Sequence, residues 1–321
     1  MLIKNSPVFI VGSYRSGTSV LTWCLGQHPN ILPLPETHWI TRLAVNMRQL
    51  YKFGTVHGRY THLGALGWDE QDFFAAFGQV VDQFVVDTRV PRLRFIRRLS
   101  AQKQGLSETQ IDELEQKGEL SPDPALVTGK NYQIVRSPSD PKLRWVDGTP
   151  ENTYYMYALS MMFPNAKFIH ILRDPNDVAK SLMRFSQAGD AGTDHGEAKA
   201  YATWHRLVEF AVKGERALGS EKVLRISFDD LVNDSEATLR ECFRFLGEEF
   251  SYDALLPLQE KINSSKVNSA NSEKMKSTTQ ESLEANAFYQ FIQETKPDMP
   301  NMEAIEELVV HFQTYADEVN K

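Results

Sequence analysis

Near the N-terminus, Pro7 to Leu25 reads Pro-Val-Phe-Ile-Val-Gly-Ser-Tyr-Arg-Ser-Gly-Thr-Ser-Val-Leu-Thr-Trp-Cys-Leu. Val8–Val11 is a short run of β-branched and aromatic residues, which predicts a buried strand. A tight glycine turn follows at residues 12–17, and apolar residues at helical spacing begin after Thr18. This order of strand, loop and helix surrounds a phosphate with backbone N–H groups and directs a helix N-terminus at it. The stretch therefore predicts a phosphate-binding loop.

The loop departs from the nucleoside-triphosphate pattern G-x-x-x-x-G-K-[ST] at one position. Gly12, Gly17 and Ser19 fit, but Thr18 stands where the lysine belongs, and the loop's cation is Arg15. Without the lysine that contacts the β- and γ-phosphates, ATP chemistry is disfavoured. An anion with its charge nearer Arg15 suits the loop better. The alternative is a glycine turn that carries an exposed arginine.

Residues 12–19, Gly-Ser-Tyr-Arg-Ser-Gly-Thr-Ser, resemble the 5′-phosphosulfate loop of sulfotransferases that use 3′-phosphoadenosine 5′-phosphosulfate (PAPS). The most similar variant is the Arg-Ser-Gly-Thr-Thr form of tyrosylprotein sulfotransferases and their bacterial relatives. The resemblance implies that Arg15 and the backbone N–H groups of residues 14–19 hold the phosphosulfate and stabilise developing charge. The cofactor-binding residues that it implies here are Ser13, Tyr14, Arg15, Ser16, Gly17, Thr18 and Ser19.

A second segment resembles the 3′-phosphate site of the same family. The run 167–172 predicts a buried strand, and Arg173-Asp-Pro follows its carboxyl end, where ligands bind in open α/β sheets. In the family an arginine at this place and a serine eight residues later hold the 3′-phosphate, and Arg173 and Ser181 match in identity and spacing. The planar guanidinium offers a dianion two charged hydrogen bonds. Taken by itself, the segment also fits an ion pair between Arg173 and Asp174.

The general base is predicted from Glu36-Thr-His38. In tyrosylprotein sulfotransferases a similar His-Pro is followed by Glu-Thr, whose glutamate is the base, and Glu36 matches it. A hydroxyl acceptor loses its proton as it attacks sulfur, and a nearby carboxylate accepts that proton. His38 is the rival base, and if the segment is a strand the two side chains share one face. For Glu36 the alternative is a surface carboxylate or an acid at the start of a helix, and for His38 taken alone a residue without a catalytic role is the better prediction.

Three positions differ from the family pattern or match it weakly. Many relatives have a lysine where Gly148 stands, and it stabilises the transferring sulfonyl group. Relatives often have a tyrosine where Phe228 stands. In the polar stretch 262–276, Lys276 is the best match to a residue that closes over the adenosine phosphates, with Lys266 and Lys274 beside it.

Composition and charge limit the class of protein and the compartment in which we expect it. The chain has 321 residues, a net charge of −7 and two cysteines, Cys24 and Cys242. The acidic balance argues against a nucleic-acid binder, and the cysteines fit a reducing compartment. No apolar run approaches a transmembrane span and no cleavage signature is visible, so we expect a cytoplasmic protein. No cluster of His, Cys and Asp has metal-ligand spacing, so no metal is expected. Oligomeric state is left open.

Secondary structure outside these motifs is predicted from periodicity and caps. Helices are expected over 41–52, 70–86, 177–185, 199–218, 235–246 and 302–319, and Ser107-Glu-Thr-Gln110 is a capping box. Thr149 and Pro150 predict a helix start. Residues 186–197 predict a loop that serves as a lid. The arginines at 89, 92, 94, 97 and 98 fit either an anionic acceptor or a solvated face paired with nearby acids.

Together these features predict a single α/β domain over 1–321, P-loop NTPase-like, with a mostly parallel sheet, helices on both faces and helical insertions. Donor-binding elements are expected near 7–38, 144–185 and 222–276, and an acceptor-binding insertion at 40–140. The resemblance implies in-line sulfonyl transfer from PAPS to the hydroxyl of a small-molecule, carbohydrate or peptide acceptor, releasing adenosine 3′,5′-bisphosphate. The alternatives are a P-loop kinase of a small molecule and a non-catalytic nucleotide-binding scaffold.

Overall fold

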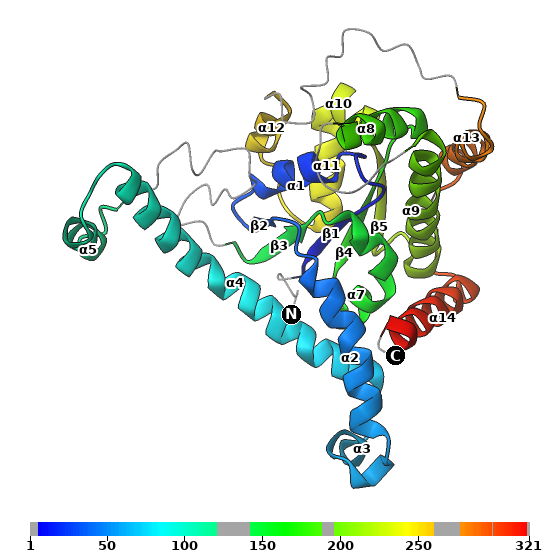
Figure 1. Ribbon diagram of the computed structural model, residues 1–321, viewed down its shortest axis with the longest axis horizontal. Helices are drawn as coiled ribbons and strands as arrows, with labels where there is room; N and C mark the ends of the chain where they lie inside the picture. The colour runs from blue at the N-terminus through cyan, green and yellow to red at the C-terminus, as the bar shows by residue number, and fades with distance from the viewer. Residues whose placement is uncertain (1–5, 121–141, 188–195, 260–276, 297, 320–321) are drawn as a thin grey trace.

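The computed structural model describes residues 6–120, 142–187, 196–259, 277–296 and 298–319 (Figure 1). In this part of the chain five strands form one parallel sheet in the order β2-β3-β1-β4-β5. Their bounds are β1 Val8–Val11, β2 Ile31–Leu34, β3 Arg144–Asp147, β4 Lys167–Leu172 and β5 Val223–Ser227. The central strand is β1, with Val8 opposite Val146 on one side and Lys167 on the other.

Both faces of the sheet are buried, as the apolar strands predict. Along β1, Val8 and Ile10 point to one face and Phe9 and Val11 to the other, because side chains alternate along a strand. The first face packs against α1 (Thr18–Gly26) and α11 (Ser235–Leu246). The second packs against α2 (Trp39–Thr55), α4 (Glu70–Lys103), α7 (Met156–Met162) and α14 (Met302–Val319). The predicted fold class, a parallel sheet with helices on both faces, is confirmed.

The remaining helices surround this centre. A third apolar cluster joins α8 (Pro175–Gln187), α9 (Glu197–Leu218) and α13 (Gln280–Gln293). Short helices complete the described residues: η1 Gly58–Tyr60, α3 His62–Leu66, α5 Glu108–Gln116, η2 Pro150–Tyr155, α10 Phe228–Asn233, η3 Tyr252–Leu255 and α12 Leu256–Gln259.

The long helix α4 corrects one prediction. The expected helix over 70–86 continues to Lys103 and so includes the predicted basic cluster. Arg94 forms an ion pair with Glu115 of α5, and Arg98 pairs with Glu108, Asp112 and Glu115. For these two arginines the structure therefore supports a solvated face paired with local acids.

Cap predictions had mixed outcomes. The capping box is present, because Ser107 and Gln110 exchange both hydrogen bonds at the start of α5. Helix α11 ends at Gly247, whose φ of 71° favours glycine. The helix start predicted from Thr149 and Pro150 is confirmed, because η2 begins at Pro150 with Thr149 as its N-cap residue, but the hydroxyl of Thr149 donates to Asp147 and caps no backbone N–H. The predicted lid falls mainly on 188–195, outside the described residues. Among the described helices, none is long and apolar enough to cross a membrane.

Candidate active site

The glycine loop between β1 and α1 has the predicted conformation. Gly12 has a φ of 142° and Gly17 a φ of 100°. A Cβ on Gly12 would lie 2.6 Å from the carbonyl oxygen of Ile171, and one on Gly17 would lie 2.5 Å from the ring of Phe228. Both glycines are therefore required by conformation and by space. Thr153 fixes the loop's start, since its hydroxyl accepts a hydrogen bond from the Gly12 N–H at 2.9 Å.

The loop presents unsatisfied polar groups that fit a bound anion. The hydroxyl oxygens of Ser13 and Ser16 are buried and have no hydrogen-bond partner within the described chain. Helix α1 begins at Thr18, and its N-cap, Gly17, supplies no side-chain cap. The N–H groups of the first turn, including that of Ser19, remain available, and they carry the positive end of the helix dipole. Buried polar groups of this kind are normally satisfied, so a phosphate-like ligand fits here.

The predicted 3′-phosphate residues lie directly beside this loop. Arg15 donates from Nε to Oγ of Ser181 at 3.1 Å, and Arg173 donates from Nη1 to the carbonyl oxygen of Arg15 at 2.9 Å. The Nε of Arg173 is buried without a partner in the described residues, and burial lowers the pKa of Arg173. Residues 158 positions apart thus form one cationic site. Lys276, Lys274 and Lys266 lie outside the described residues.

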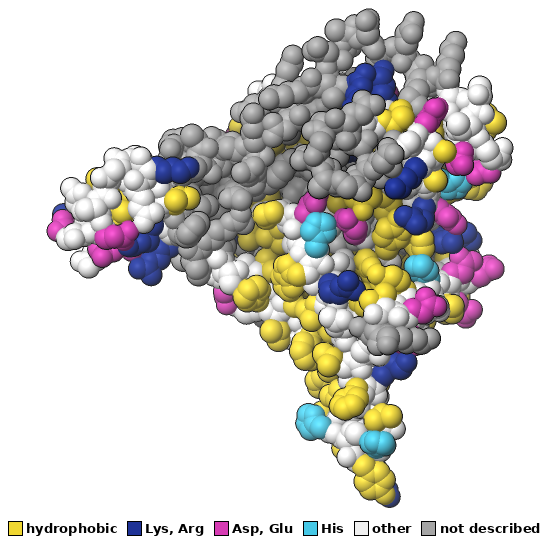
Figure 2. All heavy atoms as spheres, in the orientation of Figure 1, with side chains coloured by type: hydrophobic (Ala, Val, Ile, Leu, Met, Phe, Trp, Pro, Cys, Tyr) yellow, Lys and Arg dark blue, Asp and Glu magenta, His cyan; other side chains and the backbone are white. Residues whose placement is uncertain are grey.

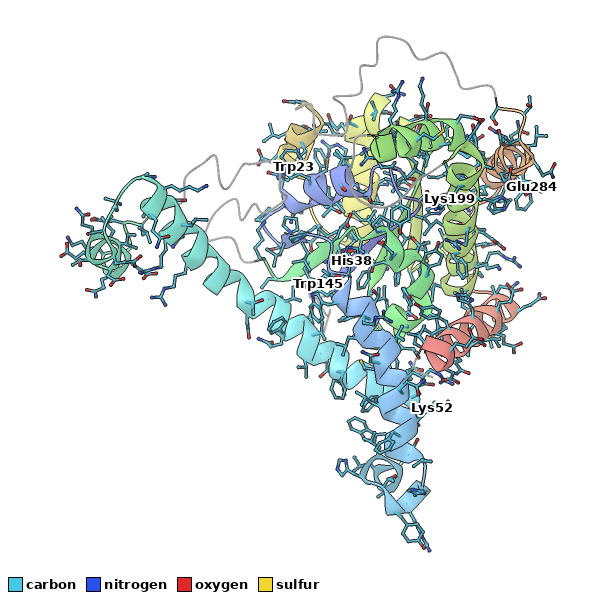
Figure 3. All side chains as sticks on the ribbon, viewed as in Figure 1. Trp23, His38, Lys52, Trp145, Lys199 and Glu284 are labelled. Carbon is cyan, nitrogen blue, oxygen red and sulfur yellow. The ribbon has the colours of Figure 1, made fainter. Side chains whose placement is uncertain are left out.

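The candidate bases lie at the start of α2 (Figure 3). Glu36 Oε2 is 3.2 Å from Nε2 of His38, and Nδ1 of His38 is 3.9 Å from Oε2 of Glu151. Burial raises the pKa of Glu36, and the Glu151 carboxylate raises it further, while His38 opposes both. Residues 35–38 are not a strand, so the expected shared strand face is wrong. The two side chains meet because His38 has a φ of 37° and turns the chain into α2.

Glu151 connects these bases to the glycine loop. The phenol of Tyr14 donates to Oε1 of Glu151 at 2.7 Å, and burial together with this hydrogen bond raises the pKa of Tyr14. The Oε2 atom of Glu151 is buried and has no hydrogen-bond partner in the described chain. One carboxylate therefore contacts the phosphate loop and faces His38.

The loop that carries Glu36 is anchored to the carboxyl end of β3. The fully buried carboxylate of Asp147 accepts hydrogen bonds from the hydroxyl of Thr37 at 2.7 Å and from the side chain of Asn152 at 2.9 Å. The backbone N–H of Thr37 donates to the hydroxyl of Thr149, which itself donates to Asp147. Asp147 thereby fixes both residues that flank Thr37.

The absence of a side chain at position 148 has a steric reason. A Cβ at this position would lie 2.1 Å from Oγ1 of Thr22 and 3.1 Å from the carbonyl oxygen of Thr18. Helix α1 approaches the end of β3 so closely that no side chain fits. The lysine of the family pattern is therefore excluded by packing.

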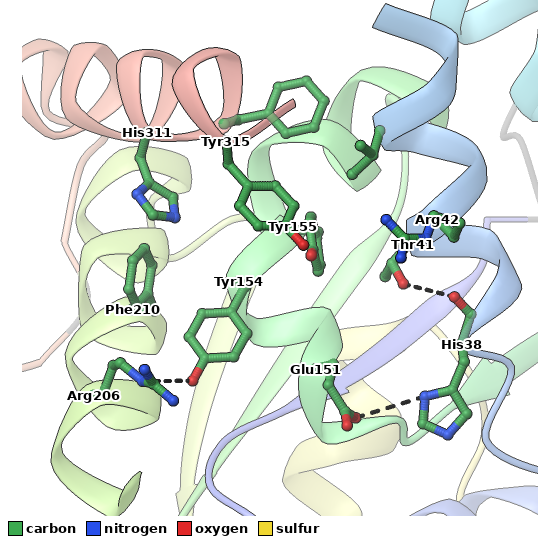
Figure 4. A pocket seen from close by; sticks show the side chains of 12 residues that line it. His38, Thr41, Arg42, Glu151, Tyr154, Tyr155, Arg206, Phe210, His311 and Tyr315 are labelled. Carbon is green, nitrogen blue, oxygen red and sulfur yellow. Dashed lines mark hydrogen bonds and ion pairs between the residues drawn. The ribbon is translucent and has the colours of Figure 1, made fainter. Parts of the chain in front are cut away.

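A pocket of about 520 Å³ opens beside His38 and Glu151 (Figure 4). Its walls come from α2, η2, α9 and α14, and they combine aromatic rings with two arginines. Tyr154 and Phe210 pack edge to face at 5.1 Å, and Arg206 donates to the hydroxyl of Tyr154 at 3.1 Å. The lining residues are His38, Thr41, Arg42, Val45, Glu151, Tyr154, Tyr155, Arg206, Phe210, His311, Phe312 and Tyr315. A ring-sized molecule in this pocket would reach the candidate bases.

Sequence reasoning missed several of these residues. Glu151 directly follows the recognised Thr149-Pro150, yet no spacing rule pairs it with Tyr14, 137 positions earlier. Asp147 could have been predicted from the sequence, because it ends a buried strand and ligands bind at the carboxyl ends of such strands. The pocket's walls lie in separate helices, and no local pattern in the sequence shows that these helices meet. Among the described residues, no group of His, Cys, Asp and Glu could hold a metal ion.

Comparisons with known proteins identify the family of this chain. Residues 7–252 match the model of the sulfotransferase family. Omega-hydroxy-beta-dihydromenaquinone-9 sulfotransferase of Mycobacterium bovis is 29% identical over 105 residues, which are 30% of this chain and 27% of that protein. The chain thus spans about a quarter of that relative's length.

Two solved structures are also similar. The sulfotransferase domain of the Synechococcus olefin synthase is 20% identical, covering 97% of this chain and 96% of that one, with a TM-score of 0.44. A Mycobacterium avium sulfotransferase is 13% identical, covering 92% and 78%, with a TM-score of 0.45. Because the family model matches most of the chain, this protein belongs to the sulfotransferase family.

Proposed function

We propose that this enzyme transfers the sulfonyl group of PAPS to a hydroxyl of a small molecule bound in the pocket between α2, η2, α9 and α14. The observation that carries the proposal is the position of Glu151. It lines the pocket and accepts a hydrogen bond from Tyr14 of the phosphate loop, so donor loop and acceptor pocket adjoin. The aromatic walls favour an acceptor with an apolar or aromatic body. The relative from Mycobacterium bovis is named for a hydroxylated menaquinone, which is consistent with that class.

In the proposed reaction the acceptor oxygen forms a bond to sulfur while the bond from sulfur to the phosphate oxygen breaks. Glu36 accepts the acceptor's proton, and its raised pKa makes it a stronger base than an ordinary glutamate. His38 and Glu151 orient Glu36 and the hydroxyl. Released negative charge stays on the phosphate oxygen, which faces Arg15 and the N–H groups at the start of α1. Gly148 leaves Arg15 with a larger share of that task.

Donor contacts follow the geometry of the cationic site. PAPS supplies the activated sulfonyl group, and its 5′-phosphosulfate would lie in the loop of residues 12–19. Arg173 and Ser181 would hold the 3′-phosphate, and Arg173 offers a buried Nε with no partner in the described chain. The two free, buried cysteines support a cytoplasmic location, where thiols remain reduced.

The first test is thermal unfolding with adenosine 3′,5′-bisphosphate or with ATP and magnesium. A ligand that binds only the native state raises the midpoint. We expect a shift with the bisphosphate that Arg173→Ala abolishes and that a remote change, Arg59→Ala, leaves intact. A shift with ATP alone would favour a small-molecule kinase, and no shift with either would favour a non-catalytic scaffold.

The second test identifies the acceptor. Hydroxylated aromatic and isoprenoid compounds are incubated with PAPS and enzyme, and sulfated product is detected by mass spectrometry. Phe210→Ala should raise the KM for the acceptor and leave bisphosphate binding unchanged, because Phe210 lines the acceptor pocket and lies outside the donor loop. If Phe210→Ala changed no acceptor's KM, the acceptor would have to bind elsewhere.

A further inference from the structure

One segment of this acidic protein has the opposite charge balance. Between Glu36 and Asp69, residues 37–68 include four Lys and Arg residues and no Asp or Glu, while the whole chain has a net charge of −7. The four cations are Arg42, Arg48, Lys52 and Arg59. Since charged surfaces usually mix both signs, a run of this kind marks a surface with its own electrostatic task.

The same segment exposes large apolar side chains at its far end. We call residues 50–68 the tip; it comprises the end of α2, η1 and α3. No residue of η1 or α3 is buried, while Phe53 and Tyr60 are 81% and 80% exposed. Figure 1 shows α3 at the end of α2 farthest from the sheet, and Figure 2 shows apolar side chains along this part of the surface. The exposed large residues of the tip are Leu50, Phe53, Val56, Tyr60, Leu66 and Trp68.

An exposed apolar patch of this kind marks a site of interaction with another surface. The tip's side chains do not pack into the three main core clusters, apart from Tyr51 and Leu63 at their edge. Removal of apolar surface from water favours association. A partner that covered the tip would therefore gain a substantial free energy of binding.

The apolar surface continues from the tip toward the active site. Phe77, Val80 and Phe84 of α4 are exposed at helical spacing, and the ring of Phe84 lies 6.1 Å from that of Trp39. Trp39 is the first residue of α2 and directly follows His38, which lines the acceptor pocket. An apolar surface thus connects the tip with the mouth of the site.

The tip's cations lie where a charged surface could meet them. Arg59 stacks over the Tyr60 ring, 5.1 Å from its centroid, and has no carboxylate within ion-pair distance in the described chain. Lys52 is half-exposed although it pairs with Asp317, whereas Arg48 is largely buried between Glu70 and Asp317. Exposed aromatic residues beside Lys and Arg are the pattern of segments that lie in a membrane interface.

We propose that the tip docks this enzyme on the surface of an anionic lipid bilayer, with Phe53 and Tyr60 inserted among the headgroups and Arg59 and Lys52 facing lipid phosphates. A second copy of the chain is the weaker occupant, because a symmetric contact between tips would place Arg59 of one copy near Arg59 of the other. Anionic lipid supplies the opposite charge. The proposal concerns a peripheral contact and does not depend on the reaction catalysed.

The experiment is co-sedimentation of the full chain with vesicles of phosphatidylcholine alone or with roughly 30% phosphatidylglycerol, which gives the negative surface of a natural leaflet. We expect binding to the anionic vesicles that weakens as salt rises. The double variant F53S/Y60S should lower the partition coefficient about tenfold or more. The control F291S/M299S, which removes two other exposed apolar residues, one on α13 and one after it, should bind like the wild type.

A charge variant separates the two contributions. Arg59→Glu should weaken binding to anionic vesicles several-fold and leave the weak binding to neutral vesicles unchanged, whereas Lys199→Glu on α9 makes the same charge change far from the tip and should have no effect. A thermal unfolding midpoint close to that of the wild type verifies that each variant is folded.

Three results would overturn the proposal. Wild-type protein that binds anionic vesicles no better than neutral ones would remove the lipid surface as partner. Equal binding by F53S/Y60S and F291S/M299S would show that the tip is not the contact. A concentration-dependent dimer in sedimentation velocity that F53S/Y60S abolishes would assign the tip to a second copy of the chain.

Discussion

The guanidinium of Arg173 lies over the ring of Phe228, with its central carbon 4.1 Å from the ring centroid. The same ring occupies the space where Gly17 would carry a Cβ, so Phe228 touches both halves of the donor site. Sequence comparison with the family suggested only that a hydroxyl is missing at this position. In the structure the ring of Phe228 positions the guanidinium of Arg173, whose Nε has no hydrogen-bond partner in the described residues.

We predict that Phe228→Leu weakens binding of adenosine 3′,5′-bisphosphate. A cation–π contact of this kind is worth about 0.5–2 kcal/mol, which corresponds to roughly 2- to 30-fold in the dissociation constant. Titration calorimetry measures the effect. Phe228→Tyr keeps the ring and should bind nearly as well as the wild type. Equal affinity in the leucine variant would mean that Arg173 is positioned by its other contacts alone.

The close approach of α1 to Gly148 predicts a packing defect. In Gly148→Ala the new Cβ would overlap Oγ1 of Thr22, so the free energy of unfolding should fall by about 1–3 kcal/mol. Gly148→Lys should be at least as destabilised and should not increase the rate of transfer. Urea unfolding tests this, with Thr22→Ala as the control. The double variant G148A/T22A should recover part of the loss, and strict additivity of the two changes would contradict the proposed overlap.

The pH dependence of transfer should report the environment of Glu36. The base must be ionised, and burial and Glu151 raise its pKa above the ordinary 4.5, so the ascending limb of kcat/KM should lie above that value. Glu151→Gln removes a negative charge and should move the limb to lower pH. His38→Asn removes a group that lowers the pKa and should move the limb to higher pH. If Glu36→Gln kept the limb and His38→Asn abolished it, His38 would be the base.

The sequence predicted those features of the fold that depend on neighbouring residues, and it missed contacts between residues that are far apart along the chain. Val8–Val11 and Lys167–Leu172 were predicted with their observed bounds, because apolar strands and the breaks that follow them are local signals. The end of α11 at Gly247 was predicted for the same reason. The start of η2 at Pro150 was also predicted, but the bond from the Thr149 hydroxyl to the buried carboxylate of Asp147 was not, because it depends on the end of β3.

The candidate site divides in the same way. Arg15, Arg173 and Ser181 belong to motifs that sequence alone reveals, and the structure brings all three together. Glu151 meets Tyr14 only because β3 is adjacent to β1 in the sheet, and strand order is not written in any local pattern. The roles of these residues and the single-domain organisation stay predictions until variants are measured.

A buried ion cluster lies beneath the donor loop, and a final prediction follows from its charges. His170 Nδ1 lies 2.6 Å from Oε1 of Glu215, and Arg225 donates to both oxygens of that carboxylate. A Cβ on Gly12 would lie 3.6 Å from His170, so the cluster supports the start of the loop. Burial alone would raise the pKa of Glu215, but His170 and Arg225 together hold it below its ordinary 4.5. Glu215→Gln leaves a buried arginine without its counter-charge and should cost about 3–5 kcal/mol at pH 7.

The sign of the pKa shift fixes the pH dependence of that loss. A carboxylate with a lowered pKa in the folded state stabilises the protein above the unfolded pKa, and the contribution disappears as pH falls through the folded value. The difference between wild type and Glu215→Gln should therefore be constant above about pH 5 and shrink below pH 4.5. Urea unfolding between pH 7 and pH 3 measures it. Glu209→Gln, which breaks an exposed pair with Lys213, should cost only about 0.3–0.5 kcal/mol. A loss in Glu215→Gln that is equally small would mean that the cluster contributes nothing to the fold.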